Sequence, residues 1–231
     1  MSSRIAVAAV CCLAGRVIAT AGDVENDPPA DAGRSPDATV ALAKLRQGNN
    51  RFVSEESMHP DETSAYRLTL QAGQHPFATV LGCADSRVVP ELIFDQGFGD
   101  LFVIRVAGNV VDPDIAGSIE YAVDHLETPL IVVLGHESCG AVTAALEDLD
   151  KGLDESRELD LLLKNIEPGL LAVPKDGRPE DRVQAAVEAN VRYAVAKLRA
   201  MEDLRDAERE GRICFLGAVY NLRTGRVRFF D

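Results

Sequence analysis

Two short motifs, each placed directly after an apolar run, constrain the fold of this chain more than any other feature. The motif CADSR at 83–87 follows the run at 77–81, and the motif HESCG at 136–140 follows the run at 130–134. Apolar runs of this length are typical of buried strands. In open α/β sheets, ligands bind at the carboxyl ends of the strands. The sequence therefore predicts that both motifs lie at the ligand-binding edge of a sheet.

The two motifs contain three side chains that bind soft metals: Cys83, His136 and Cys139. Cys and His are typical zinc ligands, and three protein ligands leave a fourth position open for water, as in a catalytic zinc site. A Cys after a strand is also often only a small buried apolar residue. The spacings CxxC and HxxxH do not occur, so the zinc-ribbon pattern is absent. The residues alone favour an open metal site and leave a purely structural role as the alternative.

Strands and helices alternate along the chain, which predicts an α/β fold with a mainly parallel sheet covered on both faces. Four strands are expected in parallel, and a fifth follows so short a turn, at 222–225, that it must be an antiparallel edge strand. The expected strands are 77–81, 101–106, 130–134, 213–220 and 226–230. The expected helices are 38–52, 64–71, 114–125, 138–149, 159–166 and 180–209.

Composition excludes several classes of function. The chain has 231 residues and a formal net charge of −13, which argues against binding to nucleic acid or to an anionic membrane surface. Five Cys are present, and Cys214 lies in an expected core strand. The remaining thiols do not form a disulfide framework, so cysteine usage does not fix the compartment.

The N-terminal segment has the features of a secretory signal. Arg4 precedes an apolar run at 5–15, and Ala-Thr-Ala at 19–21 fits a cleavage site. The run is too short to anchor the chain stably in a membrane as a helix. We expect a signal at 1–21 and a flexible linker at 22–37, and hence a periplasmic or secreted protein. An ordinary leader in a cytoplasmic protein is the alternative.

The motifs resemble the signature of the β-class carbonic anhydrases over most of the region from about residue 40 to the end. The matching segments are GCADSRV at 82–88, IRVAGN at 104–109, SIEYAV at 118–123, GH at 135–136 and CGA at 139–141. The resemblance implies one α/β domain at 38–231, with a helical arm at 38–72 that reaches onto a second subunit. It also implies a homodimer or a larger homo-oligomer.

The resemblance further implies zinc-dependent, reversible hydration of carbon dioxide to bicarbonate and a proton. Zinc would be held by Cys83, His136 and Cys139, and a zinc-bound hydroxide would attack the substrate. Asp85 would accept the hydroxide proton, and Arg87 would keep Asp85 ionised by bidentate pairing. The alternative for this pair is an ordinary surface ion pair of little energetic value.

Four further positions match substrate-pocket residues of the plant-like subgroup of this family: Gln74, Phe102, Ala107 and Tyr121. Phe102 and Ala107 also read as core residues of a strand, and Gln74 as a turn residue. A second subgroup carries a Trp three residues before the first Cys, as part of an inhibitory bicarbonate pocket. Val80 stands at that position here, so we expect Asp85 to stay off the metal. Arg105 matches an Arg of both subgroups and does not discriminate between them.

Two other functions remain open from the sequence. Relatives on this fold hydrolyse carbonyl sulfide or carbon disulfide with a nearly identical site, so only the pocket separates them from a carbonic anhydrase. A non-catalytic zinc- or bicarbonate-binding protein is the other alternative. The intact pair Asp85 and Arg87 argues against it.

Overall fold

The structure is a computed structural model and describes residues 36–231. The predicted signal at 1–21 and the predicted linker up to residue 35 lie outside the described residues. Residues 36 and 37, which we assigned to the linker, are the first residues of helix α1 (Pro36–Val53). Helix α1 therefore includes two residues before the predicted helix start at 38.

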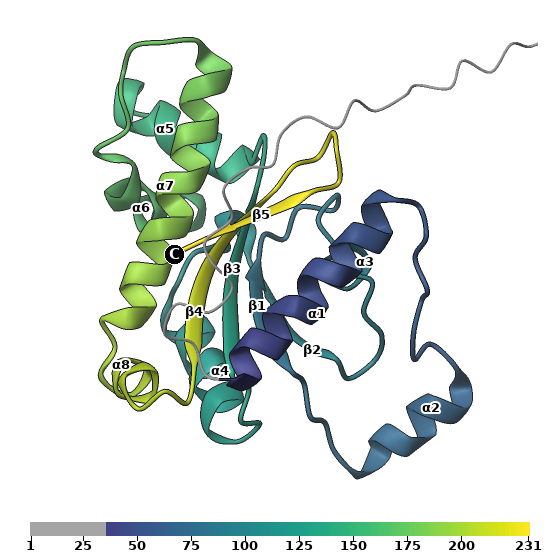
Figure 1. The fold of residues 1–231 in the computed structure, drawn as a ribbon. Coiled ribbons are helices and arrows are strands. Elements are labelled where there is room, and N and C mark those ends of the chain that lie inside the picture. The colour runs from purple at the N-terminus through teal and green to yellow at the C-terminus, as the bar shows by residue number, and fades with distance from the viewer. Residues whose placement is uncertain (1–35) are drawn as a thin grey trace, which may run out of the picture.

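A five-stranded sheet forms the centre of the molecule, in the order β2-β1-β3-β4-β5 (Figure 1). The strands are β1 (Ala78–Gly82), β2 (Leu101–Arg105), β3 (Leu130–His136), β4 (Cys214–Tyr220) and β5 (Val227–Phe230). The pairs among β1 to β4 are parallel, and β5 pairs with β4 antiparallel. The predicted fold class is confirmed, including the antiparallel edge strand.

The register of the central strands brings the two motifs together. Gly82, the last residue of β1, lies opposite Leu134 of β3. The chain therefore leaves β1 at Cys83 and ends β3 at His136 on the same edge of the sheet. All residues of β1 and β3 are buried, because both faces of a parallel sheet are covered by helices.

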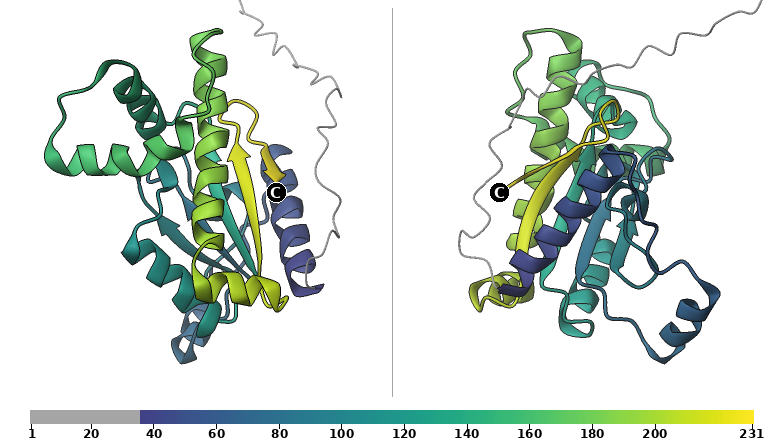
Figure 2. Two further views of the ribbon diagram at one scale, coloured as in Figure 1. Left: turned by 90° about the vertical axis from the view of Figure 1, so that its left-hand side faces the viewer. Right: turned by 45° about the vertical axis from the view of Figure 1, so that its right-hand side comes forward.

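Helices cover the two faces of the sheet in separate layers (Figure 2). One core lies between the sheet and α4 (Pro113–Asp124), α5 (Gly140–Lys151), α6 (Arg157–Leu170), α7 (Pro179–Arg199) and α8 (Glu202–Arg209). The other lies between the sheet and the helices α1 and α3 (Pro90–Ile93). Residues Ile131 and Val133 of β3 belong to the first core, and Val132 belongs to the second. This alternation follows from the two-residue period of a strand.

Helix α1 packs on its own sheet. Leu42 and Leu45, in the first part of the expected arm 38–72, are fully buried in the core of their own chain. The apolar stripe of α1 therefore packs within its own chain, and the contact of 38–72 with a second subunit stays a prediction. The second part, α2 (Ser64–Thr69) with the 3₁₀ turn Leu70–Ala72, has no buried residue and projects from the body of the molecule (Figure 1).

Three predicted helices differ in their boundaries from the helices of the structure. Helix α5 begins at Gly140 with Cys139 at the N-cap position, whereas Ser138 has a left-handed backbone (φ 53°) and cannot start a helix. The helix predicted at 180–209 is two helices, because Met201 has an extended backbone between α7 and α8. In addition, α6 continues through Pro168 to Leu170.

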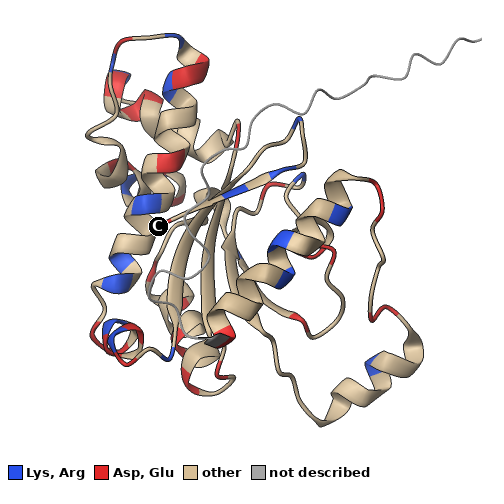
Figure 3. Cartoon of the chain, viewed as in Figure 1, with Lys and Arg blue, Asp and Glu red and all other residues tan. Residues whose placement is uncertain are grey.

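Charged side chains lie mostly on the helices and loops, and the central strands carry almost none (Figure 3). Strands β1, β3 and β4 contain no Lys, Arg, Asp or Glu. Within residues 36–231, no helix has the length and apolar character needed to span a bilayer.

Candidate metal centre

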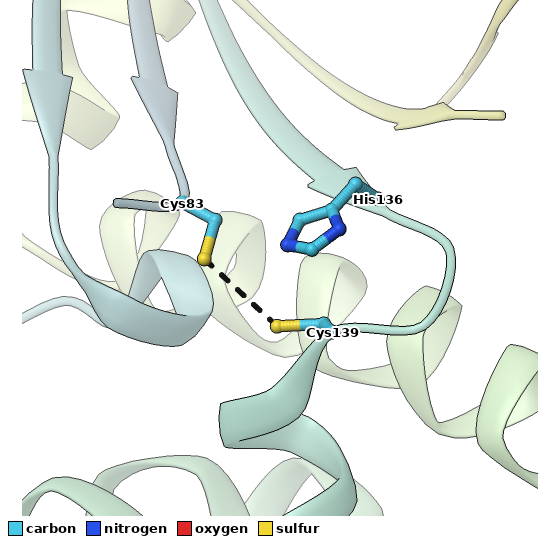
Figure 4. A group of neighbouring side chains, drawn as sticks. All are labelled: Cys83, His136 and Cys139. Carbon is cyan, nitrogen blue, oxygen red and sulfur yellow. Dashed lines mark hydrogen bonds between the residues drawn. The ribbon is translucent and has the colours of Figure 1, made fainter. Parts of the chain in front are cut away.

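The structure brings Cys83, His136 and Cys139 into one cluster (Figure 4). Cys83 directly follows β1, His136 ends β3, and Cys139 immediately precedes α5. Their ligand atoms all lie within 4.8 Å of one another, and the two Sγ atoms are 3.9 Å apart. The exposed fractions of the three residues are 4%, 0% and 1%, so the cluster is buried. Three soft donors this close together form a site for a zinc-type ion.

The imidazole of His136 is oriented as a metal ligand. Its Nδ1 lies 2.9 Å from the backbone oxygen of Glu137, to which it donates a hydrogen bond when the proton is on Nδ1. The lone pair of Nε2 is then free, and Nε2 is buried without a hydrogen-bond partner among the described residues. Buried polar atoms are rarely left unsatisfied, so this nitrogen fits a metal ion as its missing partner.

The thiols are also prepared for a cation. The Cys83 Sγ accepts hydrogen bonds from the backbone N–H groups of Asp85 (3.4 Å) and Gly108 (3.3 Å). The hydrogen bond from Cys139, helped by these amides, lowers the pKa of Cys83 to about 4. The same contact and burial raise the pKa of Cys139, because two adjacent thiolates repel each other in a buried site. A bound divalent cation removes that repulsion, so the donor set fits zinc with both thiols ionised.

The carboxylate of Asp85 lies beside the cluster and is held by Arg87. The guanidinium donates from Nε to Oδ1 (2.9 Å) and from Nη2 to Oδ2 (2.7 Å), and the backbone N–H of Arg87 also donates to Oδ1. The Oδ2 atom is 3.8 Å from the Nε2 of His136, which is beyond hydrogen-bond distance. The hydrogen bonds from Arg87 hold the pKa of Asp85 well below its usual range.

Arg105 has a role that the sequence did not reveal. Its Nε donates to the backbone oxygen of Cys83 (3.1 Å), and its Nη2 donates to that of Asp85 (2.7 Å). Arg105 therefore fixes the backbone of the first motif. Arg87 links the two motifs directly, since its Nη2 donates to the backbone oxygen of Ser138 at 3.4 Å. The sequence offered one signal for this role, which is that Arg105 lies near the end of an expected strand. The structure places Arg105 opposite Gly82.

Of the four predicted substrate residues, Ala107 is the one that directly adjoins a residue hydrogen-bonded to the cluster in the described structure. Ala107 lies next to Gly108, whose amide contacts Cys83. Phe102 is half-buried in β2, with its ring 6.3 Å from the ring of Tyr121, and the side chains of Tyr121 and Gln74 are exposed. The role of these residues in substrate binding stays a prediction.

Comparison with known proteins decides the family. A carbonic anhydrase family model matches residues 78–227, which include both motifs, strands β1 to β4 and the first residue of β5. The chain is 43% identical over 193 residues to carbonic anhydrase 2 of Mycobacterium tuberculosis, covering 83% of this chain and 92% of that protein. It is 42% identical to a carbonic anhydrase of Mycolicibacterium smegmatis, with 81% and 91% of the two chains covered. This chain belongs to the carbonic anhydrase family.

Solved structures assign this carbonic anhydrase to the β class. The β-carbonic anhydrase CcaA matches with a TM-score of 0.66 and 29% identity, covering 83% of this chain and 88% of that one. One of two tetrameric β-carbonic anhydrases from Sordaria macrospora matches with a TM-score of 0.65 and 25% identity, covering 83% and 98%. The enzyme is therefore a carbonate dehydratase that depends on zinc, and Cys83, His136 and Cys139 form a candidate metal site in it.

Proposed function

We propose that each chain holds one zinc ion through Cys83, His136 and Cys139, with the fourth position open to water and carbon dioxide. The observation that supports this is the buried cluster of three soft donors with an ionised Asp85 beside it. When bound, zinc lowers the pKa of a coordinated water so that the water becomes a nucleophile near neutral pH.

In this proposal Asp85 is the acceptor of the site. Its Oδ2 lies 3.8 Å from Nε2 of His136, so it is positioned to accept a hydrogen bond from the nucleophilic water. That acceptor role leaves a lone pair of the water directed at the carbon of the substrate. Arg87 uses two parallel hydrogen bonds to keep the carboxylate ionised and fixed in orientation.

The hydrogen bonds between Arg87 and Asp85 also favour the plant-like subgroup, in which we expect Asp85 to stay off the metal. A carboxylate tied to a guanidinium by two short bonds is restrained from moving onto the metal. Val80 is fully buried in β1, and no Trp is present in the sequence to build the inhibitory bicarbonate pocket of the other subgroup. We therefore assign this enzyme to the plant-like subgroup, with Gln74, Phe102, Ala107 and Tyr121 as its pocket residues.

The alternative substrates carbonyl sulfide and carbon disulfide are separated from carbon dioxide by a direct comparison. Purified protein of measured zinc content is assayed with all three substrates at steady state. We expect the value of kcat/KM to be highest for carbon dioxide. A higher value for either sulfur compound would assign the protein to the hydrolases of this fold. Zinc without any of the three activities would support the non-catalytic alternative.

We also propose that the chain forms a homodimer or a larger homo-oligomer through β2 and α2. The outer edge of β2 has no strand beside it in the described chain. Leu68 of α2 and Phe98 are exposed, and the ring of Phe98 lies 5.8 Å from the guanidinium of Arg67. Helix α2 and the loop before β2 thus contact each other, and both carry an exposed apolar side chain. The tetrameric relatives from Sordaria macrospora support assembly of this kind.

Leu68→Glu is expected to reduce the oligomer to a smaller species, because a charge would replace an apolar side chain that is 64% exposed in the single chain. The measurement is molar mass by light scattering after size-exclusion chromatography. Leu161→Glu on α6 is the matched control, since Leu161 is also an exposed Leu, at 54%, but lies on the opposite layer. An unchanged mass for Leu68→Glu, or the same loss for both variants, would contradict the proposed interface.

Export to the periplasm or the medium is a further proposal, and it rests on the sequence of residues 1–21. A fusion of residues 1–25 to a reporter should be exported and cut after Ala21, because the charged start, the apolar run and the small residues match a signal. Val10→Arg in the fusion interrupts the apolar run and should retain the reporter in the cell. An intact N-terminus on the native protein would contradict export.

A further inference from the structure

A buried Asn on α7 is linked to the metal site through one glycine. Asn190 is 2% exposed, and its Nδ2 donates a hydrogen bond of 2.8 Å to the backbone oxygen of Gly108. The backbone N–H of Gly108 in turn donates to the Sγ of Cys83 at 3.3 Å. We propose that Asn190 is a positioning residue that holds Gly108 so that its amide stays directed at the metal-binding thiolate. This inference rests on the zinc site proposed above.

Gly108 needs an external restraint because its own backbone is unusual. It has a left-handed conformation (φ 65°, ψ 17°) inside the 3₁₀ turn Ala107–Asn109. A Cβ atom at this position would lie 2.6 Å from Ile166 Cδ1 and 3.3 Å from Ala141 Cβ, so a side chain would force Ile166 to shift. The conformation and the close packing favour glycine, which is also the residue with the greatest freedom to leave this conformation.

The polar side chain at position 190 is otherwise unexplained. Asn190 lies on the buried face of α7, between Val187, Val191 and Ala194. An amide in apolar surroundings costs free energy unless it is hydrogen-bonded, so an apolar residue would suit packing alone. The bond to Gly108 supplies the reason for an amide here.

Helix α7 is also well placed to act as a rigid support. It packs so closely on β3 that a Cβ atom at Gly135 would lie 2.5 Å from Val191 Cγ2. Gly135 directly precedes the ligand His136. The same helix therefore supports the strand that carries one metal ligand and the amide that contacts another.

Loss of the Asn190 side chain is expected to weaken zinc binding. Among the described residues, the Sγ of Cys83 accepts backbone amide bonds from Asp85 and Gly108, and the second would no longer be fixed. Outer partners of metal ligands typically contribute about 10–100-fold in affinity. Asn190→Ala should therefore raise the dissociation constant for zinc by about that factor.

Lys197 on the same helix offers a matched control. Its Nζ donates to the backbone oxygen of Val111 at 2.6 Å, so it also links α7 to the segment that follows β2. Within residues 36–231, no hydrogen bond joins Val111 to Cys83, His136 or Cys139. Lys197→Met should therefore remove a comparable tether and leave zinc affinity unchanged.

The experiment measures zinc affinity by competition with a chromogenic chelator, together with the thiolate-to-metal charge-transfer absorption of the Co²⁺-loaded protein. Asn190→Ala should show weaker zinc binding and a shifted charge-transfer band, and Lys197→Met should show neither. Thermal unfolding of each variant separates a general loss of stability from the local effect.

Wild-type zinc affinity and spectrum in Asn190→Ala would overturn the inference, as would the same changes in Lys197→Met. If Asn190→Ala does not fold, Asn190→Ser is used, because its hydroxyl is too short to replace the amide and leaves less unsatisfied polar surface. The same outcomes then decide. A wild-type protein that binds no zinc would instead contradict the proposed function.

Discussion

Replacing Cys139 with Ser is expected to abolish zinc binding and carbon dioxide hydration together. The Sγ of Cys139 is one of three ligand atoms within 4.8 Å, and it is buried, so no other side chain can take its place without rearrangement. A hydroxyl is a hard donor that does not ionise near neutral pH, and zinc prefers a thiolate at such a site. Loss of the metal removes the activated water, so activity should fall by several orders of magnitude.

The measurement is zinc content of the purified variant beside its initial hydration rate. Cys83→Ser and His136→Ala should behave in the same way, because each removes one ligand. Cys214→Ser is the matched control, since Cys214 on β4 is outside the cluster and should keep both zinc and activity. Full zinc occupancy in Cys139→Ser would show that the ligand assignment is wrong.

Arg87→Ala is expected to lose most of its activity while it keeps its zinc. All three metal ligands remain in this variant, but Asp85 loses both side-chain hydrogen bonds and its counter-charge. The carboxylate is then free to move the short distance onto the metal and displace water. Asp85→Asn should also keep zinc, because it removes only the ionised acceptor. Positioned acid–base groups contribute about 10²–10⁴-fold, which is the loss expected for either variant.

The pH dependence of the wild-type enzyme tests the same pair. The pKa of Asp85 is held below its usual range, so this carboxylate stays ionised from about pH 6.5 to 9 and cannot itself produce a rise in activity there. Hydration should increase with pH as the nucleophilic water loses its proton, without an abrupt loss near about pH 8. A sigmoidal loss of hydration activity with strong inhibition by added bicarbonate would contradict the subgroup assignment. It would not contradict the assignment of the metal ligands.

Much of the site could be predicted because its signals are local. Each metal-binding motif directly follows a buried strand, and parallel strands place their carboxyl ends on one edge. The apolar runs before Cys83 and before His136 were therefore enough to expect both at one site, and the structure confirms that arrangement.

The contacts that tune the site could not be predicted, because they join residues distant in the sequence. Arg105 donates a hydrogen bond to the backbone of Asp85, which lies 20 positions earlier in the sequence. Asn190 donates one to Gly108, which lies 82 positions earlier. No local pattern encodes such a pairing. The packing of α1 is a related case. The spacing of Leu42 and Leu45 shows that one face of α1 is buried, but it does not show which chain covers that face.

The most direct test of the account is a zinc titration of metal-free protein, followed by the carbon dioxide hydration rate at each step. The hydration activity should rise in proportion to bound zinc and reach its plateau at one zinc ion per chain. Protein that is fully loaded with zinc at Cys83, His136 and Cys139 but hydrates carbon dioxide no faster than buffer would contradict it.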